Sequence, residues 1–193
     1  MSHRPLTPGE IALARTMFGD SLDYAAVRLH DRRILPPGLQ DRHQAVAVNN
    51  DISFAGTSYS DDFGAEPDGV KQSVFIHEMC HVWQHQNRVL STAREGVREM
   101  LRHGFNYGAA YPYDLRNGRD LTDYGFEQQA AMVQDYFLLT RHGDTGSFKN
   151  RRLTRGDAAT LKRKYESVLK NFLKDPAYAR GRRDRKRRGG PKP

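Results

Sequence analysis

The chain has 193 residues, a mass of 22.0 kDa and a formal net charge of +8, which suits one domain with a core of its own. Its single cysteine excludes a disulfide within the chain, and no apolar run reaches the roughly 18 residues that a membrane span needs. Because the amino terminus lacks the apolar core of a signal peptide, we expect synthesis in the cytoplasm and, for any export, a machine that reads no cleavable signal.

The first third of the chain predicts a helix followed by short strands. Thr7 is a cap residue, Pro8 takes the first helical position and Glu10 falls three residues after the cap, so a helix begins here and ends near Gly19. Residues 27–30 predict a short strand. Residues 44–48 and 52–54, joined by residues 49–51, predict a hairpin.

The next segment contains an HExxH pattern, His77-Glu78-Met79-Cys80-His81. Residues 70–90 lack Pro and Gly and have apolar residues at helical spacing, which predicts a buried helix. Helical residues four apart differ by about 40° in azimuth and roughly 6 Å in rise, so both imidazoles share one face. Two imidazoles so placed can hold Zn²⁺, with Glu78 near enough to act as general base. The pattern predicts amide-bond hydrolysis, most often of a peptide.

Other residues of the same helix are excluded from this role. His85 lies roughly 12 Å in rise beyond His77, too far for one ion whose bonds are about 2 Å long, so we expect it at the rim. The longer HExxHxxGxxH pattern fails, because Gln84 and Asn87 stand where Gly and His would be. Cys80 is interpreted as a small packing residue. The preceding hairpin is the candidate edge for binding an extended substrate backbone.

Residues 95–103 predict a solvated helix, and residues 107–114 a loop rich in tyrosine. A hydrolase of this kind benefits from a donor to the tetrahedral oxyanion, commonly a Tyr or His. The candidates are Tyr111, Tyr113, Tyr124 and His103. Of these four residues, we expect Tyr124 to be the catalytic one.

The third metal ligand is expected to be Glu127, near the start of a helix predicted over residues 124–141. Ala130 and Ala131 on that helix are small enough to let a second helix approach closely. A carboxylate at a helix start is also favoured by the helix dipole alone, which is the alternative explanation of Glu127. The competing carboxylates are Glu95, Glu99, Asp114, Asp120, Asp123 and Asp135.

The end of the chain predicts a last helix and a basic tail. Residues 156–173 carry an apolar stripe formed by Leu161, Tyr165, Val168, Leu169 and Phe172. Residues 175–193 hold eight basic residues and two acids, so most of the net charge lies there. We expect residues 1–174 to form the domain and residues 175–193 a disordered tail that solubilises the chain or docks on a polyanion or carrier.

The motifs HEMCHVWQHQ, FEQQA and DYF resemble the gluzincin-type metallopeptidase domains called Vgr-related, associated with type VI secretion and other contractile injection machinery. The resemblance spans roughly residues 5–142 and implies zinc on His77, His81 and Glu127, with Glu78 as base. The chain departs from the better-known gluzincin pattern at Ala131, where an Asp would stand. The carboxylate that orients an imidazole is therefore unidentified.

We therefore expect an α+β, helix-dominated zincin-like domain with a small hairpin or sheet before the HExxH helix. The expected function is that of a zinc metallopeptidase, linked to type VI or related secretion as an effector or processing protease. Its partners would be a protein or peptide substrate and a VgrG-like secretion component. The alternative is a non-catalytic, zinc-containing adaptor that docks through the basic tail. Nucleic-acid binding is the weakest hypothesis, because no aromatic residues interleave the arginines of the tail.

Overall fold

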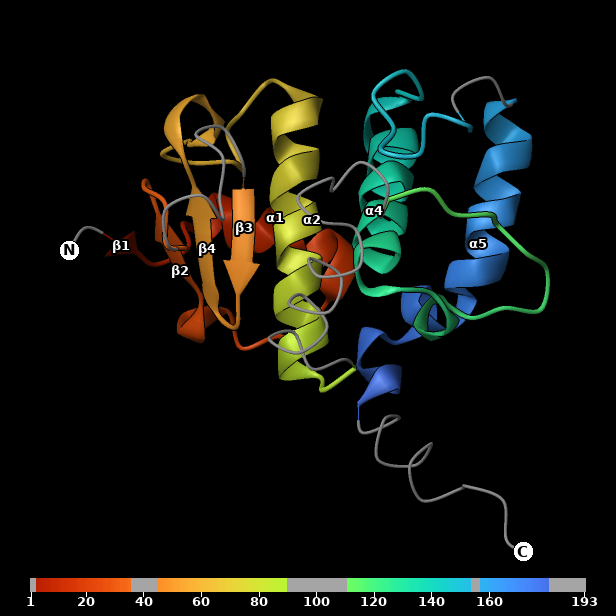
Figure 1. Cartoon of the computed structure of the whole chain (residues 1–193), viewed down its shortest axis with the longest axis horizontal. Helices are drawn as coiled ribbons and strands as arrows, with labels where there is room; N and C mark the ends of the chain where they lie inside the picture. Colours follow the sequence, from red (N-terminus) through yellow and green to blue (C-terminus); the bar gives the residue numbers. More distant parts are fainter. Residues whose placement is uncertain (1–2, 36–44, 90–110, 154–156, 181–193) are drawn as a thin grey trace, which may run out of the picture.

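The computed structural model describes residues 3–35, 45–89, 111–153 and 157–180. In these residues a small sheet packs beside a group of helices, so the predicted α+β class is confirmed. In the view of Figure 1, the sheet, helix α2 (Gly69–Gln86), helix α4 (Phe126–Phe137) and helix α5 (Ala158–Lys174) follow one another from left to right. No helix in the described ranges is long and apolar enough to cross a membrane.

The sheet has four short strands in the order β1-β2-β4-β3. Strands β1 (His3–Arg4) and β2 (Arg28–His30) pair antiparallel, and β2 runs parallel to β4 (Asp51–Phe54). Strand β3 (Ala45–Val48) pairs antiparallel with β4, with Val48 opposite Asp51. The predicted hairpin is thus confirmed for residues 45–54, with Asn49 at φ 58° in its turn. Residue 44 lies outside the described residues.

Helix α1 (Pro8–Phe18) begins as the capping box predicts. The Thr7 hydroxyl accepts a hydrogen bond from the Glu10 amide, and the Glu10 carboxylate accepts one from the Thr7 amide. Glu10 is fully buried and also pairs with Arg4 at 2.8 Å, which ties the first helix to the first strand. Gly19, at φ 51°, caps the other end. The predicted end of this helix is therefore confirmed.

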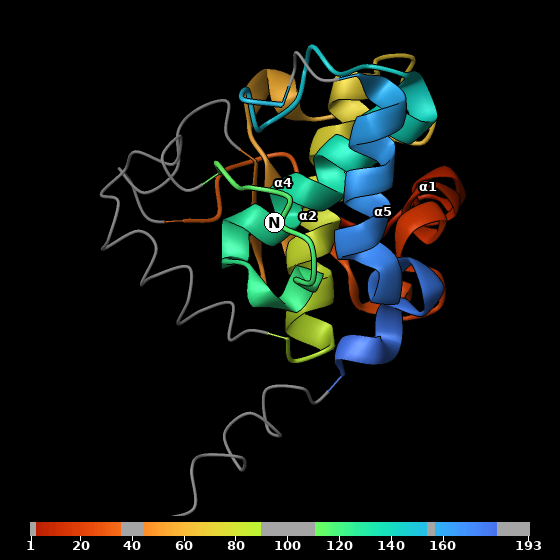
Figure 2. The ribbon, with the colours of Figure 1, turned by 90° about the vertical axis from the view of Figure 1, so that its right-hand side faces the viewer.

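Helices α1, α2 and α5 meet in the core. The ring of Phe172 in α5 contacts Phe18 of α1 at 5.9 Å and Trp83 of α2 at 5.2 Å between centroids. The predicted stripe of α5 is buried along its length. Figure 2, turned by 90°, shows α5 between α1 and α4. The helix that carries the HExxH motif is consequently packed on several sides, which fixes its orientation.

Two predicted boundaries differ from the structure. The helix predicted over residues 124–141 begins at Phe126, because Gly125 is its cap and the Gln128 side chain returns to the Gly125 amide. Its last turn is a π-helix (Leu138–His142) that ends at Gly143, at φ 64°. Helix α5 begins at Ala158 on the Asp157 cap, whereas residues 154–156 lie outside the described residues.

The folded domain continues past residue 174. Residues Pro176–Ala179 form a 3₁₀ turn, and the Pro176 carbonyl accepts a hydrogen bond from the Trp83 indole at 2.9 Å. Tyr178 donates to Asp120 at 2.7 Å, and Ala179 is fully buried. Residues 176–179 of the predicted tail therefore pack on the core and are ordered. Residues 181–193 of the predicted tail, and the helix predicted over residues 95–103, fall outside the described residues.

Candidate metal centre

Helix α2 places His77 and His81 one turn apart on a single buried face. Their ring centroids are 4.9 Å apart, and the rings meet edge to face at 83°. Both residues are about 95% buried. The i, i+4 spacing produces this pairing through backbone geometry alone, since such residues share a helix face. Two ring nitrogens are thereby held together away from solvent.

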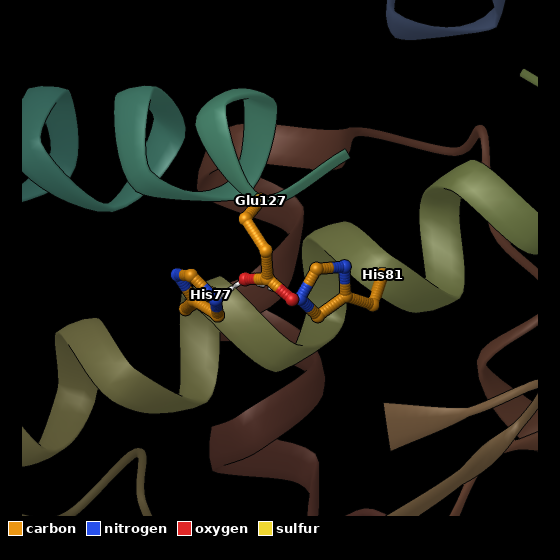
Figure 3. A group of neighbouring side chains, drawn as sticks. All are labelled: His77, His81 and Glu127. Carbon is orange, nitrogen blue, oxygen red and sulfur yellow. Dashed lines mark hydrogen bonds and ion pairs between the residues drawn. The ribbon is translucent and has the colours of Figure 1, made fainter. Parts of the chain in front are cut away.

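Glu127 reaches these imidazoles from the first turn of α4 (Figure 3). Its Oε2 lies 3.2 Å from His77 Nε2 and 3.5 Å from His81 Nε2. Ala130 and Ala131, one turn after Glu127, are fully buried, and Gln134 one turn further on donates to Ser73 of α2, so this face of α4 packs on α2. Figure 1 shows α2 and α4 side by side. The structure thus brings together the three residues predicted as ligands.

These three side chains form the group of potential metal ligands among the described residues, with one ligand atom from each lying within 4.8 Å of the others. Zinc bonds of about 2.0–2.1 Å in a tetrahedron separate neighbouring ligand atoms by about 3.4 Å. The two nitrogen–oxygen distances, 3.2 and 3.5 Å, match that spacing. A set of two imidazoles and one carboxylate also suits zinc chemically. The residues present therefore fit this ion.

The other carboxylates considered as ligands lie elsewhere. Asp114 is exposed, and Asp123 closes a capping box with Asp120 before α4. Asp135 is buried but bonds to Tyr113 and to two backbone amides. Glu95 and Glu99 fall outside the described residues. His85 is half-buried and is no member of the ligand group, as expected for a residue at the rim.

The charges of the cluster are strongly coupled. Burial lowers the pKa of His77 to about 4, so its imidazole is neutral near pH 7. Burial also lowers the pKa of His81, but the carboxylates of Glu127 and Glu78 outweigh this effect and raise it to about 9. Burial would raise the pKa of Glu127, yet the two imidazoles together hold it below its ordinary range. The cluster therefore favours a bound positive charge, which is a proton on His81 when no metal is present.

Gln84 orients the His81 ring. Its Oε1 lies 2.8 Å from His81 Nδ1, so that Nδ1 donates to Gln84 and Nε2 faces Glu127, where it carries the proton in the metal-free state and would offer a lone pair to a metal ion. The Gln84 amide nitrogen donates in turn to the Phe126 carbonyl and to Gln129. The Phe126 ring stacks on His81 with centroids 4.2 Å apart. The sequence identifies no carboxylate that could orient an imidazole. In the structure the side-chain amide of Gln84, three residues after His81, orients the His81 ring.

The Glu78 side chain extends from α2 to the edge strand β3. It is buried, and its carboxylate accepts a hydrogen bond from the Ala47 backbone. Burial raises the pKa of Glu78 to about 7. Glu78 Oε2 is a buried oxygen without a hydrogen-bond partner in the part of the chain that the structure describes. A carboxylate with a pKa near neutrality and an uncommitted oxygen is suited to accept and return a proton.

Of the tyrosines considered as oxyanion donors, Tyr113 and Tyr124 bond to groups outside the cluster, whereas Tyr111 contacts His77. The Tyr124 hydroxyl donates to the Asp114 carbonyl at 2.8 Å and accepts from the Arg116 amide at 3.1 Å. Tyr113 donates to Asp135 in the core. The catalytic role predicted for Tyr124 therefore receives no support from its hydrogen bonds. In contrast, the Tyr111 ring packs edge to face on His77, with centroids 5.8 Å apart. His103 lies outside the described residues.

Comparisons with known proteins agree with the type VI part of the resemblance. No family model matches the chain. The chain is 38% identical over 178 residues to the type VI secretion system spike protein VgrG2b of Pseudomonas aeruginosa. That match covers 88% of the chain and 15% of the spike protein, so the chain spans a small part of this relative.

A solved structure, the effector domain of Pseudomonas aeruginosa VgrG2b, aligns with a TM-score of 0.65 and 38% identity. The alignment covers 79% of the chain and 82% of that domain. Identity of this level over most of both chains indicates common descent. The chain therefore belongs to the family of type VI secretion-related proteins that includes the VgrG2b effector domain.

Proposed function

We propose that the chain is a zinc-dependent metallopeptidase domain that acts as a type VI secretion effector. The observation that carries the proposal is the buried cluster of His77, His81 and Glu127, whose ligand atoms lie within 4.8 Å of one another, with Glu78 next to His77 on the same helix. Three protein ligands are typical of catalytic zinc sites, because a further position remains open to water or substrate. The relationship to an effector domain favours this role over that of a processing protease.

In this proposal His77, His81 and Glu127 hold the ion. When bound, zinc polarises the carbonyl of the scissile amide and makes water easier to deprotonate. Glu78 takes a proton from the water that attacks the carbonyl carbon. After the carbon–nitrogen bond breaks, Glu78 returns that proton to the leaving amine, so the products are a carboxylate and an amine. Its pKa of about 7 suits both transfers.

The β3 edge supports binding of an extended substrate. Sheet order places β3 at the end of the sheet, paired on one side with β4. The Ala47 amide donates to Glu78, so this strand borders the proposed base directly. An edge strand can hydrogen-bond an extended peptide through its backbone groups. We propose that the substrate backbone lies along β3 and that its scissile amide reaches Glu78.

The test combines metal analysis with peptide cleavage on the purified chain. We expect about one zinc per chain in the wild type and in Glu78→Gln, and far less in His81→Ala. Glu78→Gln should lower kcat/KM by about 10²–10⁴-fold, because general acid–base catalysis contributes this much. His85→Ala is the matched control, since it removes a histidine of the same helix that is no ligand. Absence of cleavage by the zinc-loaded wild type would refute the enzyme and favour an adaptor role, whereas equal cleavage by Glu78→Gln and the wild type would refute the role of Glu78 as the base.

A further inference from the structure

The Lys149 side chain lies close to the metal cluster and forms no ion pair with a carboxylate of the described residues. Lys149 Nζ sits 4.7 Å from the centroid of the Tyr111 ring, and that ring packs on His77. Among the described residues, no carboxylate oxygen lies within 4.0 Å of this ammonium. Its described contact is thus the face of an aromatic ring, a cation–π arrangement. Its charge is felt by the nearby carboxylates of Asp135 and Glu78, but neither lies within 4.0 Å as an ion-pair partner.

The backbone around Lys149 is anchored in the core. The Lys149 amide donates to Asp135 Oδ1 at 2.6 Å, and the Asn150 amide donates to Asp135 Oδ2 at 3.0 Å. The Asn150 side chain donates to the Tyr113 carbonyl at 2.6 Å, and the Tyr113 hydroxyl bonds to the same carboxylate. One buried aspartate therefore joins the segment that carries Lys149 to the segment that carries Tyr111.

The Lys149 ammonium lies a short distance from the metal cluster. The two ring distances place the ammonium within about 10.5 Å of the His77 ring, their combined length. An extended peptide advances about 3.4 Å per residue. The ammonium therefore lies within about three residues of a bond cleaved at the cluster.

We propose that Lys149 is a specificity-determining residue that selects substrates with a carboxylate within about three residues of the scissile bond. This inference rests on the proposed peptidase function and adds a substrate class to it. An ammonium that packs on a ring and has no carboxylate within 4.0 Å among the described residues keeps an attraction for an external anion. Asp135 acts as a positioning residue, because it accepts a hydrogen bond from the Lys149 amide and so fixes the backbone at that residue.

In the test, a proteome-derived peptide library is digested separately with the zinc-loaded wild type and with the variants Lys149→Gln, Lys149→Arg and Lys149→Glu. For the wild type we expect Asp and Glu to exceed Asn and Gln by about five- to tenfold at one position near the cut. Lys149→Arg should keep this preference, Lys149→Gln should abolish it, and Lys149→Glu should replace it with Lys and Arg. Lys162→Gln, an exposed lysine on α5, is the control that should change nothing.

Binding gives a readout that does not depend on turnover. In the Glu78→Gln background, a fluorescent acidic peptide from the library should bind about tenfold more weakly once Lys149→Gln is added. The same peptide with Gln in place of its acid should show no such change. Circular dichroism and zinc content establish that each variant is folded.

The outcomes separate this inference from the proposed function. Cleavage by the wild type without any acidic preference refutes the role of Lys149 and leaves the peptidase intact. A loss in Lys149→Gln that is equal for acidic and neutral peptides also refutes it, because that pattern belongs to a group acting on every substrate. Absence of cleavage by zinc-loaded wild type refutes the peptidase and this inference together.

Discussion

Two buried carboxylates on α4, eight residues apart, have opposite surroundings. Asp135 accepts hydrogen bonds from the Tyr113 hydroxyl and from two backbone amides, so its oxygens are satisfied by fixed neutral donors. Glu127 instead faces two imidazoles and depends on a proton or a cation between them. Among the described residues, His77 Nδ1 and Glu78 Oε2 are buried atoms without a hydrogen-bond partner, and both residues belong to the helix that faces Glu127. A satisfied buried carboxylate holds structure together, whereas an incompletely satisfied one marks a site for chemistry.

The largest effect that tests this contrast is expected for Glu127→Ala. The variant removes one of three ligands, so we expect zinc affinity to fall by at least about a thousandfold while the metal-free fold persists. Competition with a chromophoric chelator measures the affinity. Asp123→Ala, an exposed carboxylate just before the same helix, is the control and should bind zinc normally. Unchanged zinc binding by Glu127→Ala would contradict the assignment of the third ligand.

The next effect concerns Asp135→Ala, which should act on stability instead of metal binding. It leaves the Tyr113 hydroxyl and two buried amides without their acceptor, so we expect a loss of about 3 kcal/mol in the free energy of unfolding. Denaturant titration of the metal-free protein measures it. The control is Asp144→Ala, whose carboxylate accepts from two amides of an exposed turn and should cost below about 1 kcal/mol. If Asp135→Ala loses more free energy of zinc binding than free energy of unfolding, the purely structural role of Asp135 is contradicted.

A pH effect of intermediate size is expected in the metal-free protein. The folded-state pKa of His81, about 9, exceeds its ordinary value of 6.5. Its contribution to stability is therefore fully present below pH 6.5 and is lost as the pH rises through 9. We expect chelator-treated protein to lose about 1–3 kcal/mol over this window, with a falling Tm. Zinc-loaded protein should lose less, because the ion replaces the proton. A flat Tm in chelator would contradict the pairing of His81 with Glu127.

The smallest effect is expected for Gln84→Ala. Without its amide the His81 ring is less firmly oriented, so zinc affinity should fall by about 10- to 100-fold, the range for groups that support a ligand. Gln86→Ala is the matched control: it lies on the same helix and bonds to the Asp23 backbone, far from the ligands. Equal zinc affinity in both variants would show that His81 needs no such support.

Local patterns in the sequence predicted what one element determines by itself. The capping box at Thr7, the hairpin turn at Asn49 and the shared face of His77 and His81 all follow from backbone geometry within a few residues. The apolar stripe of α5 is buried as its period predicts. For the same reason Glu78 was identified at once, since its place one step from the imidazoles is set by the helix.

Contacts between distant segments were decided by the tertiary structure. Glu127 was one of several carboxylates until the packing of α4 on α2 brought it, fifty residues from His77, to hydrogen-bonding distance. Three other contacts also depend on packing. Gln84 bonds to the His81 ring, the Tyr124 hydroxyl donates to the Asp114 carbonyl, and the Lys149 ammonium packs on the Tyr111 ring. The sequence by itself determined which helix presents the histidines, because helical periodicity is a local property. Which groups meet them depends on how the helices pack, and that follows from the burial of the whole apolar core.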